Sequence, residues 1–332
     1  MAGPALGERG WQPWRSAMAA LTAPGGFYRR GGARQFRTAA RSELFAAALL
    51  RLIQTVDTAL ARPARLQVVD VGAGGGELLT ALAALADREL ASRLDLLGVD
   101  VETRPDQLPA VIGWSHRLPA AISGCVVAHE WLDTVPIDVV ERTPAGLRVI
   151  EVNGRGEERR AGKPTARDAA WVGEYWPGAQ RAEVGWRRDV AWRALVRRVR
   201  AGLAVAIDYQ ADPTVSPLGT LTGYRDGRQV RPLPDGRTDI TAHVLFGSLI
   251  DPESRLLTQA EALERLGPPS SLPPRSAADN DPGGYLRTLV RIGERAELAR
   301  PTGWGGFGWL VRAVGMPHPD DLVGSTAIGA SD

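Results

Sequence analysis

The chain has 332 residues, of which 44% are hydrophobic and 23% charged, ordinary values for a globular protein with a sizeable core. Its 40 basic and 38 acidic residues nearly cancel, so charge gives no reason to expect nucleic acid as a partner. One cysteine excludes an internal disulfide and a cysteine-based metal site, and the four histidines lack metal-ligand spacing, so we expect no metal.

The N-terminal segment has no apolar core of the kind found in signal peptides. No run of 18 uncharged apolar residues occurs, which argues against a membrane span. We therefore expect a cytoplasmic protein that does not interact with membranes. Its length fits one α/β domain with insertions.

Residues 1–40 are rich in Gly, Pro and Arg and are predicted to form an arm with one short helix around 14–21. Strands and helices then alternate along the chain. Strands are predicted at 66–71, 94–99, 111–114, 125–128 and 203–207, and helices at 41–61, 77–90, 165–175 and 189–200. This alternation predicts a Rossmann-like α/β fold, with a mostly parallel sheet and helices on both faces.

The predicted core domain, 41–315, carries two insertions, at about 139–200 and 210–300. The first contains a strand–turn–strand over 139–152 and a polar loop at 153–164. The second contains an extended stretch over the sheet edge and three helices, at 240–250, 258–266 and 282–299. The apolar run 307–314 is expected to close the sheet, and 316–332 is expected to be a frayed tail.

A glycine turn follows the first predicted strand. It consists of Asp70, Gly72, Gly74 and Gly76. Glycine lets the chain leave the strand tightly and lets a ligand lie against bare backbone. A dinucleotide fingerprint needs G-x-G-x-x-G, and the carboxylate of Glu77 would oppose a pyrophosphate at the helix start. The turn instead suits S-adenosyl-L-methionine, which has no phosphate and whose positive charge and amino group fit Asp70 and Glu77.

Asp100 ends the next predicted strand, at the spacing expected for an acidic residue that bonds ribose hydroxyls. Glu102 is a nearby competitor for this role. The alternative interpretation of the turn is structural, a glycine turn with a helix cap. The letters of a dinucleotide fingerprint recur at 303–308, but no strand precedes them, so we regard that match as fortuitous.

A polar segment follows the strand predicted at 125–128. Ligands of open parallel sheets bind beyond the carboxyl ends of the strands, near the topological switch point. We therefore predict that Glu130 and Asp133 are catalytic, that Glu130 also contacts the cofactor, and that His129 contacts the substrate. A carboxylate can hold a guanidinium acceptor in a bidentate fork and orient its nitrogen. The alternative is that both carboxylates cap a short helix.

Further substrate contacts are predicted at the end of the fifth strand and in a later polar segment. Asp208 and Tyr209 occupy a position in the sheet equivalent to that of Glu130. His243, in the segment that begins at Asp239, is a candidate to fold over the site, and a structural role is the alternative. Trp131 is the tryptophan that we expect near a ligand.

These segments resemble the MidA family of methyltransferases, which includes the mitochondrial assembly factor that dimethylates an arginine of a respiratory complex I subunit. The family motif Asn-Glu-Φ-Φ-Asp-Ala-Φ-Pro (Φ apolar or aromatic) is similar to 129–136. Ile-Asp-Tyr-Gly is similar to 207–210, Asp-Φ-Thr-Ala-His-Val to 239–244, and Phe-x-Thr-Ser to 36–39. His129, Thr134 and Gln210 differ from the family's Asn, Ala and Gly, and Arg41 lies near the place of a family acidic residue.

The resemblance implies a class I methyltransferase fold, S-adenosyl-L-methionine as the cofactor and a protein substrate modified on arginine. Three other hypotheses remain: a non-catalytic cofactor-binding assembly factor, a small-molecule methyltransferase with an apolar lid at 210–239, and a nicotinamide-dependent oxidoreductase, which Glu77 disfavours. The sequence leaves open the acceptor, the number of methyl groups transferred and the oligomeric state.

Overall fold

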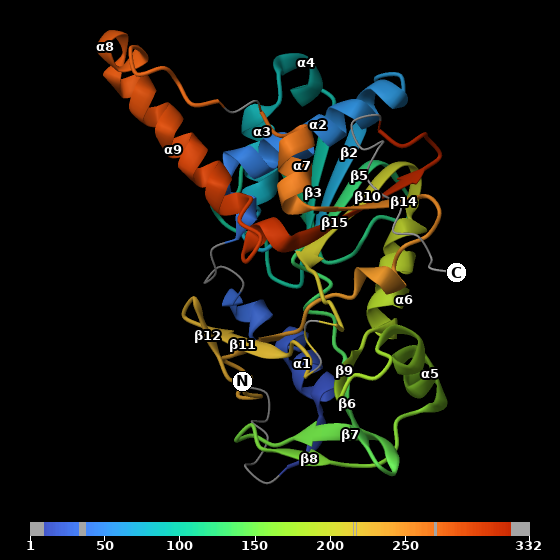
Figure 1. The fold of residues 1–332 in the computed structure, drawn as a ribbon. Helices are drawn as coiled ribbons and strands as arrows, with labels where there is room; N and C mark the ends of the chain where they lie inside the picture. Colours follow the sequence, from blue (N-terminus) through green and yellow to red (C-terminus); the bar gives the residue numbers. More distant parts are fainter. Residues whose placement is uncertain (1–9, 33–37, 215, 217, 269–270, 320–332) are drawn as a thin grey trace.

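A seven-stranded sheet forms the centre of the computed structural model, which describes residues 10–32, 38–214, 216, 218–268 and 271–319 (Figure 1). The strand order is β14-β15-β10-β5-β2-β3-β4. The bounds are β2 Leu66–Val71, β3 Leu94–Val99, β4 Ile112–Ser115, β5 Ile122–His129, β10 Val199–Tyr209, β14 Ser254–Thr258 and β15 Phe307–Val314. β2, β3, β4, β5 and β10 are mutually parallel, and β15 is antiparallel to both of its neighbours. The predicted class I methyltransferase-like fold is confirmed.

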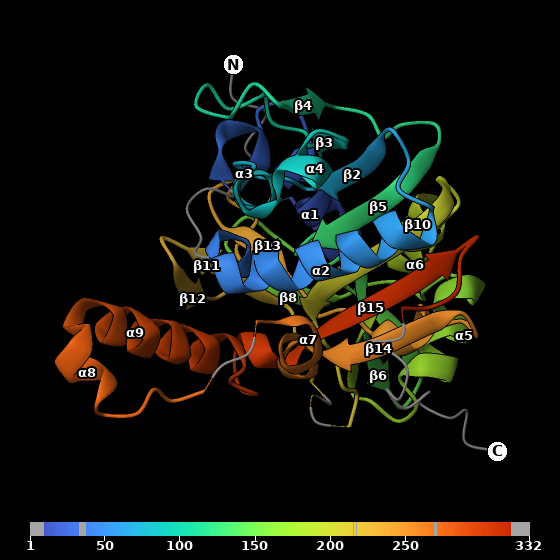
Figure 2. The same ribbon diagram turned by 90° about the horizontal axis from the view of Figure 1, so that it is seen from above.

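Helices cover both faces of this sheet (Figure 2). α2 (Glu43–Ala59), α3 (Glu77–Leu85) and α7 (Gln259–Leu266) pack on one face, and α6 (Trp186–Val196) packs on the other. α2 begins at Ser42, whose Oγ accepts hydrogen bonds from the amides of Leu44 and Phe45. The strand order changes direction between β2 and β5, so the ends of these two strands flank the topological switch point.

Two antiparallel sheets lie below the carboxyl ends of the central strands in Figure 1. One has the order β1-β7-β6-β9, with β8 on β7, and the other has the order β12-β11-β13. Their bounds are β1 Gln12–Pro13, β6 Asp138–Thr143, β7 Gly146–Val152, β8 Glu158–Arg160, β9 Arg181–Val184, β11 Thr222–Arg225, β12 Arg228–Val230 and β13 Asp239–Thr241. α1 (Trp14–Thr22) packs on the first sheet through buried Trp14 and Met18.

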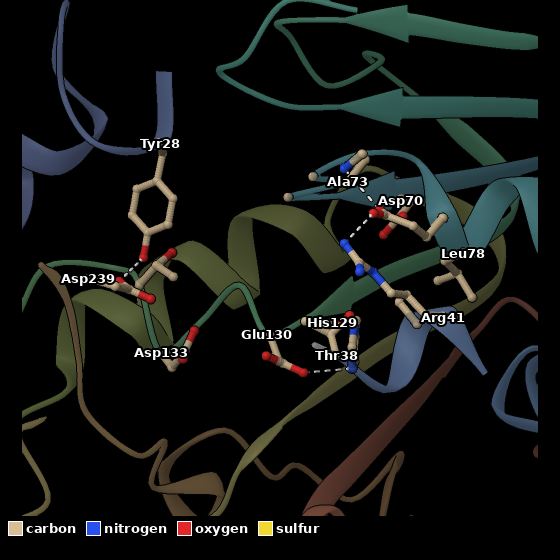
Figure 3. A pocket seen from close by; sticks show the side chains of 16 residues that line it. Tyr28, Thr38, Arg41, Asp70, Ala73, Leu78, His129, Glu130, Asp133 and Asp239 are labelled. Carbon is tan, nitrogen blue, oxygen red and sulfur yellow. Dashed lines mark hydrogen bonds and ion pairs between the residues drawn. The ribbon is translucent and has the colours of Figure 1, made fainter. Parts of the chain in front are cut away.

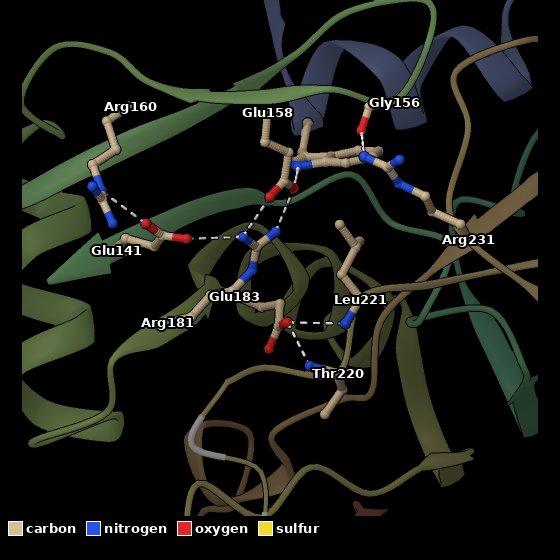
Figure 4. A network of polar contacts seen from close by, with 10 residues as sticks. Glu141, Gly156, Glu158, Arg160, Arg181, Glu183, Thr220, Leu221 and Arg231 are labelled. Carbon is tan, nitrogen blue, oxygen red and sulfur yellow. Dashed lines mark hydrogen bonds and ion pairs between the residues drawn. The ribbon is translucent and has the colours of Figure 1, made fainter.

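A polar network ties these sheets together (Figure 4). The guanidinium of Arg181 pairs with Glu158 at 2.6 Å and with Glu141 at 3.2 Å. On the same strand, the buried carboxylate of Glu183 accepts hydrogen bonds from the amides of Thr220 (2.7 Å) and Leu221 (3.0 Å). The insertion after β10 is thereby joined to β9.

The remaining elements are short turns of helix, the ten-residue helix α5 and one long helical arm. Their bounds are η1 Tyr28–Arg30, η3 Ala39–Arg41, α4 Arg88–Ala91, α5 Ala166–Tyr175, η4 Phe246–Ser248, α8 Ala277–Asn280, α9 Pro282–Leu298 and η5 Trp304–Gly306. α8 and α9 project from the body (Figure 1). In the part of the chain that the structure describes, no helix is both long and apolar enough to span a membrane.

Several predicted elements differ from the structure. The helix predicted at 240–250 is wrong, because Asp239–Thr241 forms β13 against β11 and only η4 follows. The predicted loop 153–164 contains β8, and the predicted helix 77–90 is divided because Asp87 caps a separate helix, α4. β14 was not predicted. Within the predicted tail, residues 320–332 lie outside the described part of the chain.

Candidate active site

Two adjoining hollows lie at the carboxyl ends of β2 and β5. The acidic hollow, of about 90 Å³, is lined by the carboxylates of Asp70, Glu77, Glu130, Asp133 and Asp239. The Asp100 hollow, of about 300 Å³, is lined by Val99, Asp100, Val101, His116, Leu118 and Trp131. The two share the walls formed by Tyr28, Gly72, Glu130 and Thr134. An elongated ligand can therefore extend from one hollow into the other.

The glycine turn forms the floor between the hollows. Gly72, Gly74 and Gly76 have φ values of +76°, +56° and +77°, in the left-handed region that favours glycine. A Cβ atom on Gly72 would lie 3.0 Å from Cδ1 of Trp131. The amide of Gly74 donates to Oδ2 of Asp100 at 2.9 Å, which links the turn to the end of β3. The turn thus offers bare backbone to a ligand.

A carboxylate already occupies the start of the helix after the turn. The amide of Gly75 donates to Oε2 of Glu77 at 3.0 Å. The other oxygen of Glu77 lies 3.2 Å from Nη2 of Arg41. A pyrophosphate at this helix N-terminus would have to displace Glu77. The geometry therefore argues against a nicotinamide dinucleotide and fits a cofactor that has no phosphate.

Asp100 was predicted to bind the ribose, and its carboxylate lines the Asp100 hollow. Its two carboxylate oxygens accept from the amides of Gly74 (2.9 Å) and Glu102 (2.8 Å), and each retains a lone pair for a hydroxyl. Nδ1 of His116 lies 2.9 Å from the carbonyl oxygen of Asp100, which places the imidazole beside the same hollow. Glu102, the predicted competitor, lines neither hollow.

Asp70 is a buried carboxylate on the wall of the acidic hollow. Burial, together with the charges of Asp100 and Glu77, raises its pKa from 3.8 to about 7. An ammonium group nearby would stabilise the charged form. This fits the predicted role of Asp70 beside the amino group of the cofactor.

Replacing Asp70 with asparagine tests this role through its pH dependence. In the wild type, affinity for S-adenosylhomocysteine should rise as the pH increases through about 7, because Asp70 then loses its proton. The D70N variant should bind more weakly above pH 7 and show a flatter profile. Because the raised pKa means that the carboxylate destabilises the fold at high pH, D70N should also melt at a higher temperature at pH 8. Calorimetric titration and thermal melts from pH 5.5 to 8.5 would show both effects, and an unchanged pH profile in D70N would contradict the assignment.

Glu130 has a strained backbone. It follows the last residue of β5 with a φ of +49°, uncommon for a residue other than glycine, and its amide donates to the carbonyl of Ile207 at 2.8 Å. Such strain is concentrated at functional sites. Burial and the charges of Asp133 and Asp239 raise the pKa of Glu130 well above its usual value. Its Oε1 atom is buried without a hydrogen-bond partner in the described residues.

His129 lies beside Glu130 at the back of the acidic hollow (Figure 3). Its Nε2 atom is 3.3 Å from Oε1 of Glu130, but the angles are not those of a hydrogen bond. The ring packs against Phe45, with 4.9 Å between the ring centroids. Burial lowers the pKa of His129 to about 3, so the imidazole is neutral and adds no charge to the hollow.

Asp133 and Asp239 lie at the end of this hollow that is far from Arg41 (Figure 3). Oδ2 of Asp133 accepts a hydrogen bond of 2.6 Å from Oγ1 of Thr241, while its Oδ1 is buried without a partner in the described residues. The hydroxyl of Tyr28 donates to Oδ1 of Asp239. Burial is the main cause that raises the pKa of Asp133, and it brings that of Asp239 to about 7.

Asp208, Tyr209 and His243, predicted as substrate contacts, line neither hollow. Asp208 is fully buried and accepts hydrogen bonds from the amides of Asp133 (3.0 Å) and Tyr209 (2.9 Å). Tyr209 and His243 stack with ring centroids 5.3 Å apart. Asp208 thus positions the segment that carries Asp133.

Three residues of the site were not predicted from the sequence. Tyr28 and Arg41 line the acidic hollow from segments that precede the core domain or begin it. Arg188, on α6, is buried and donates 2.6 Å hydrogen bonds to the carbonyls of Asp133 and His243, which fixes the wall from behind. The only sequence signal was the resemblance at 36–39, next to Arg41, and residues 36 and 37 lie outside the described residues.

The fold and the glycine turn together define a class I methyltransferase. A family model described as "Putative S-adenosyl-L-methionine-dependent methyltransferase" matches residues 45–267, more than half of the chain. The chain belongs to this family, the MidA-like methyltransferases, and its cofactor is S-adenosyl-L-methionine. No protein with a curated description matches the sequence.

Two solved structures from Burkholderia thailandensis share the fold. One, described as a "likely methyl transferase" and bound to S-adenosylhomocysteine, is 24% identical, with a TM-score of 0.76 and coverage of 94% of this chain and 90% of that one. The other, an uncharacterised protein of the same superfamily, is 25% identical, with a TM-score of 0.74 and coverage of 96% and 91%. These likenesses extend over nearly the whole chain.

Proposed function

We propose that this methyltransferase transfers its methyl group to an arginine side chain of a protein. The observation that carries the proposal is the pair of buried carboxylate oxygens, Oε1 of Glu130 and Oδ1 of Asp133, that lack a hydrogen-bond partner among the described residues. Buried polar atoms in native proteins almost always have a hydrogen-bond partner. Two carboxylate oxygens without one on a cavity wall therefore indicate that a donor from a ligand is missing. A guanidinium has five N–H donors in a planar fork that suits carboxylates.

The charge of the hollow supports the same acceptor. Burial raises the pKa of Glu130, Asp133 and Asp239, and the charge of Asp133 raises the pKa of the other two further. A bound cation removes this repulsion and lets the carboxylates ionise together. Guanidinium stays protonated at any physiological pH, so it would enter as that cation.

The residues of the site would align the acceptor and take up its proton. The cofactor supplies a methyl group on a positively charged sulfur, and transfer is an in-line displacement that depends mainly on positioning. Hydrogen bonds to Glu130 and Asp133 would hold the guanidinium so that one nitrogen faces the methyl carbon. As the new N–C bond forms, that nitrogen becomes more acidic, and the raised pKa of Glu130 suits it to accept the released proton.

One further observation supports a polypeptide as the carrier of the arginine. The 210–239 insertion, which would be an apolar lid in a small-molecule methyltransferase, contributes to a three-stranded sheet in which Arg228 and Gln229 are exposed. Arginine is also the methyl acceptor that the resemblance to the MidA family implies.

Transfer of a labelled methyl group tests the proposal. The protein would be incubated with deuterated S-adenosyl-L-methionine and a dialysed cell extract, and the proteins analysed by mass spectrometry. We expect the labelled methyl on arginine side chains. Label on lysine or a carboxyl group, label only on small molecules added back to the extract, or no transfer would each overturn the proposal.

A further inference from the structure

We infer that Arg41 binds the α-carboxylate of the cofactor and so distinguishes it from adenosine compounds that lack the amino acid. The inference concerns the cofactor and does not depend on which acceptor is methylated. Arg41 is the sole lysine or arginine among the described residues that line the acidic hollow, and five carboxylates line the same space. A binding site for a zwitterion needs both signs of charge, and Arg41 provides the positive one.

The order of the hollows places Arg41 at the methionine end. Asp100 marks the ribose, and the walls shared by the two hollows, Gly72 and Glu130 among them, lie between the ribose and the amino acid. Beyond these walls the acidic hollow runs along the glycine turn to Arg41 and Asp70, which both lie at one end of it (Figure 3). Tyr28 and Asp239 lie at the opposite end. An amino acid with its ammonium at Asp70 would therefore direct its carboxylate to Arg41.

The backbone holds Arg41 in this position while its side chain can exchange partners. Arg41 ends the short helix η3, which packs against α3 and is anchored by fully buried Ala39. Its guanidinium lies 3.2 Å from Glu77, in a pair whose side chains are 46% and 34% exposed. An ion pair with this exposure contributes little to stability. A carboxylate in the adjacent hollow would form a bidentate pair with better geometry.

Comparing the affinities of two ligands distinguishes carboxylate binding by Arg41 from a purely structural role. S-Adenosylhomocysteine carries the amino acid, whereas 5′-methylthioadenosine has the same nucleoside and sulfur without it. Calorimetric titration of R41Q should show S-adenosylhomocysteine affinity reduced by about 10- to 100-fold. The affinity for 5′-methylthioadenosine should change by less than about 2-fold. R41K, which keeps the charge but not the fork, should fall between wild type and R41Q.

The matched control is R51Q, on the exposed surface of α2, which should bind both ligands as the wild type does. A merely structural ion pair with Glu77 predicts a different pattern in R41Q, with both affinities lowered together or neither changed. Either pattern would overturn the inference. Thermal melts of R41Q and R41K would show that both variants are folded.

Discussion

Replacing Asp133 with asparagine is expected to lower turnover by about 100- to 1,000-fold, the range seen when one group that stabilises a transition state is removed. Affinity for S-adenosylhomocysteine should change by less than about 3-fold, because Asp133 lies at the end of the acidic hollow opposite Asp70 and Arg41, where we place the amino acid of the cofactor. The asparagine oxygen can still accept the hydrogen bond from Thr241, so the fold should be retained. Methyl transfer assays and calorimetric titration would give the two values.

Glu183 offers a matched control for this variant. It is also a buried carboxylate with one oxygen, Oε2, that lacks a partner in the described residues, but it lies outside the acidic hollow. E183Q should therefore leave turnover within about 3-fold of wild type if the variant folds. Turnover by D133N equal to that of wild type, or loss of cofactor binding in D133N as severe as the loss of turnover, would contradict the assigned role.

Replacing Gly72 with valine is expected to abolish measurable binding of S-adenosylhomocysteine, a loss of at least about 100-fold. A β-branched side chain at a φ of +76° is strained, and its Cβ would lie 3.0 Å from Trp131, at the floor shared by the two hollows. The side chain would also occupy the space in which the cofactor contacts bare backbone. The backbone strain should cost about 1–3 kcal/mol of stability.

A substitution at Gly178 distinguishes the effect of backbone strain from the effect of losing the binding surface. It has a φ of +78°, and a Cβ there would meet no atom within 4 Å. G178V should therefore lose a similar amount of stability in denaturant unfolding and keep its affinity for S-adenosylhomocysteine. If G72V bound the ligand as tightly as wild type, the cofactor would not lie on the glycine turn.

The central sheet could be predicted from the sequence because its strands are buried on both faces and read as continuous apolar runs. The predicted bounds of Leu66–Val71 and Leu94–Val99 match those of β2 and β3. The segment after β10 was harder, because Asp239–Thr241 is a strand only through its pairing with β11, a long-range contact that local periodicity does not report. Short peripheral strands such as β8 were missed for the same reason.

The residues of the site likewise fall into those that could be predicted from the sequence and those that could not. Residues at the ends of core strands, such as Asp70, Asp100 and Glu130, could be proposed because sheet topology fixes where such residues lie. Tyr28 and Arg41 come from N-terminal segments whose path across the hollow depends on tertiary packing. Asp208 also lies near the end of a core strand, but its buried carboxylate accepts a hydrogen bond from the backbone amide of Asp133, and it lines neither hollow.

Our two proposals assign different tasks to different parts of the acidic hollow. Asp70 and Arg41 carry opposite charges beside the glycine turn, which suits the amino acid of the cofactor. Glu130 and Asp133 have unpaired buried oxygens, which suit a donor-rich acceptor. Arg188 and Asp208 fix the wall between them from behind, so substitutions there should act on the geometry of Asp133 rather than on direct contacts.

The most direct test of the central claim is a crystal structure of the protein with S-adenosylhomocysteine and an arginine peptide taken from a labelled substrate. Our account predicts the guanidinium within hydrogen-bond distance, about 3 Å, of both Glu130 and Asp133, with one nitrogen facing the sulfur. A peptide bound with its arginine outside the acidic hollow, or with Glu130 and Asp133 still without partners, would contradict it.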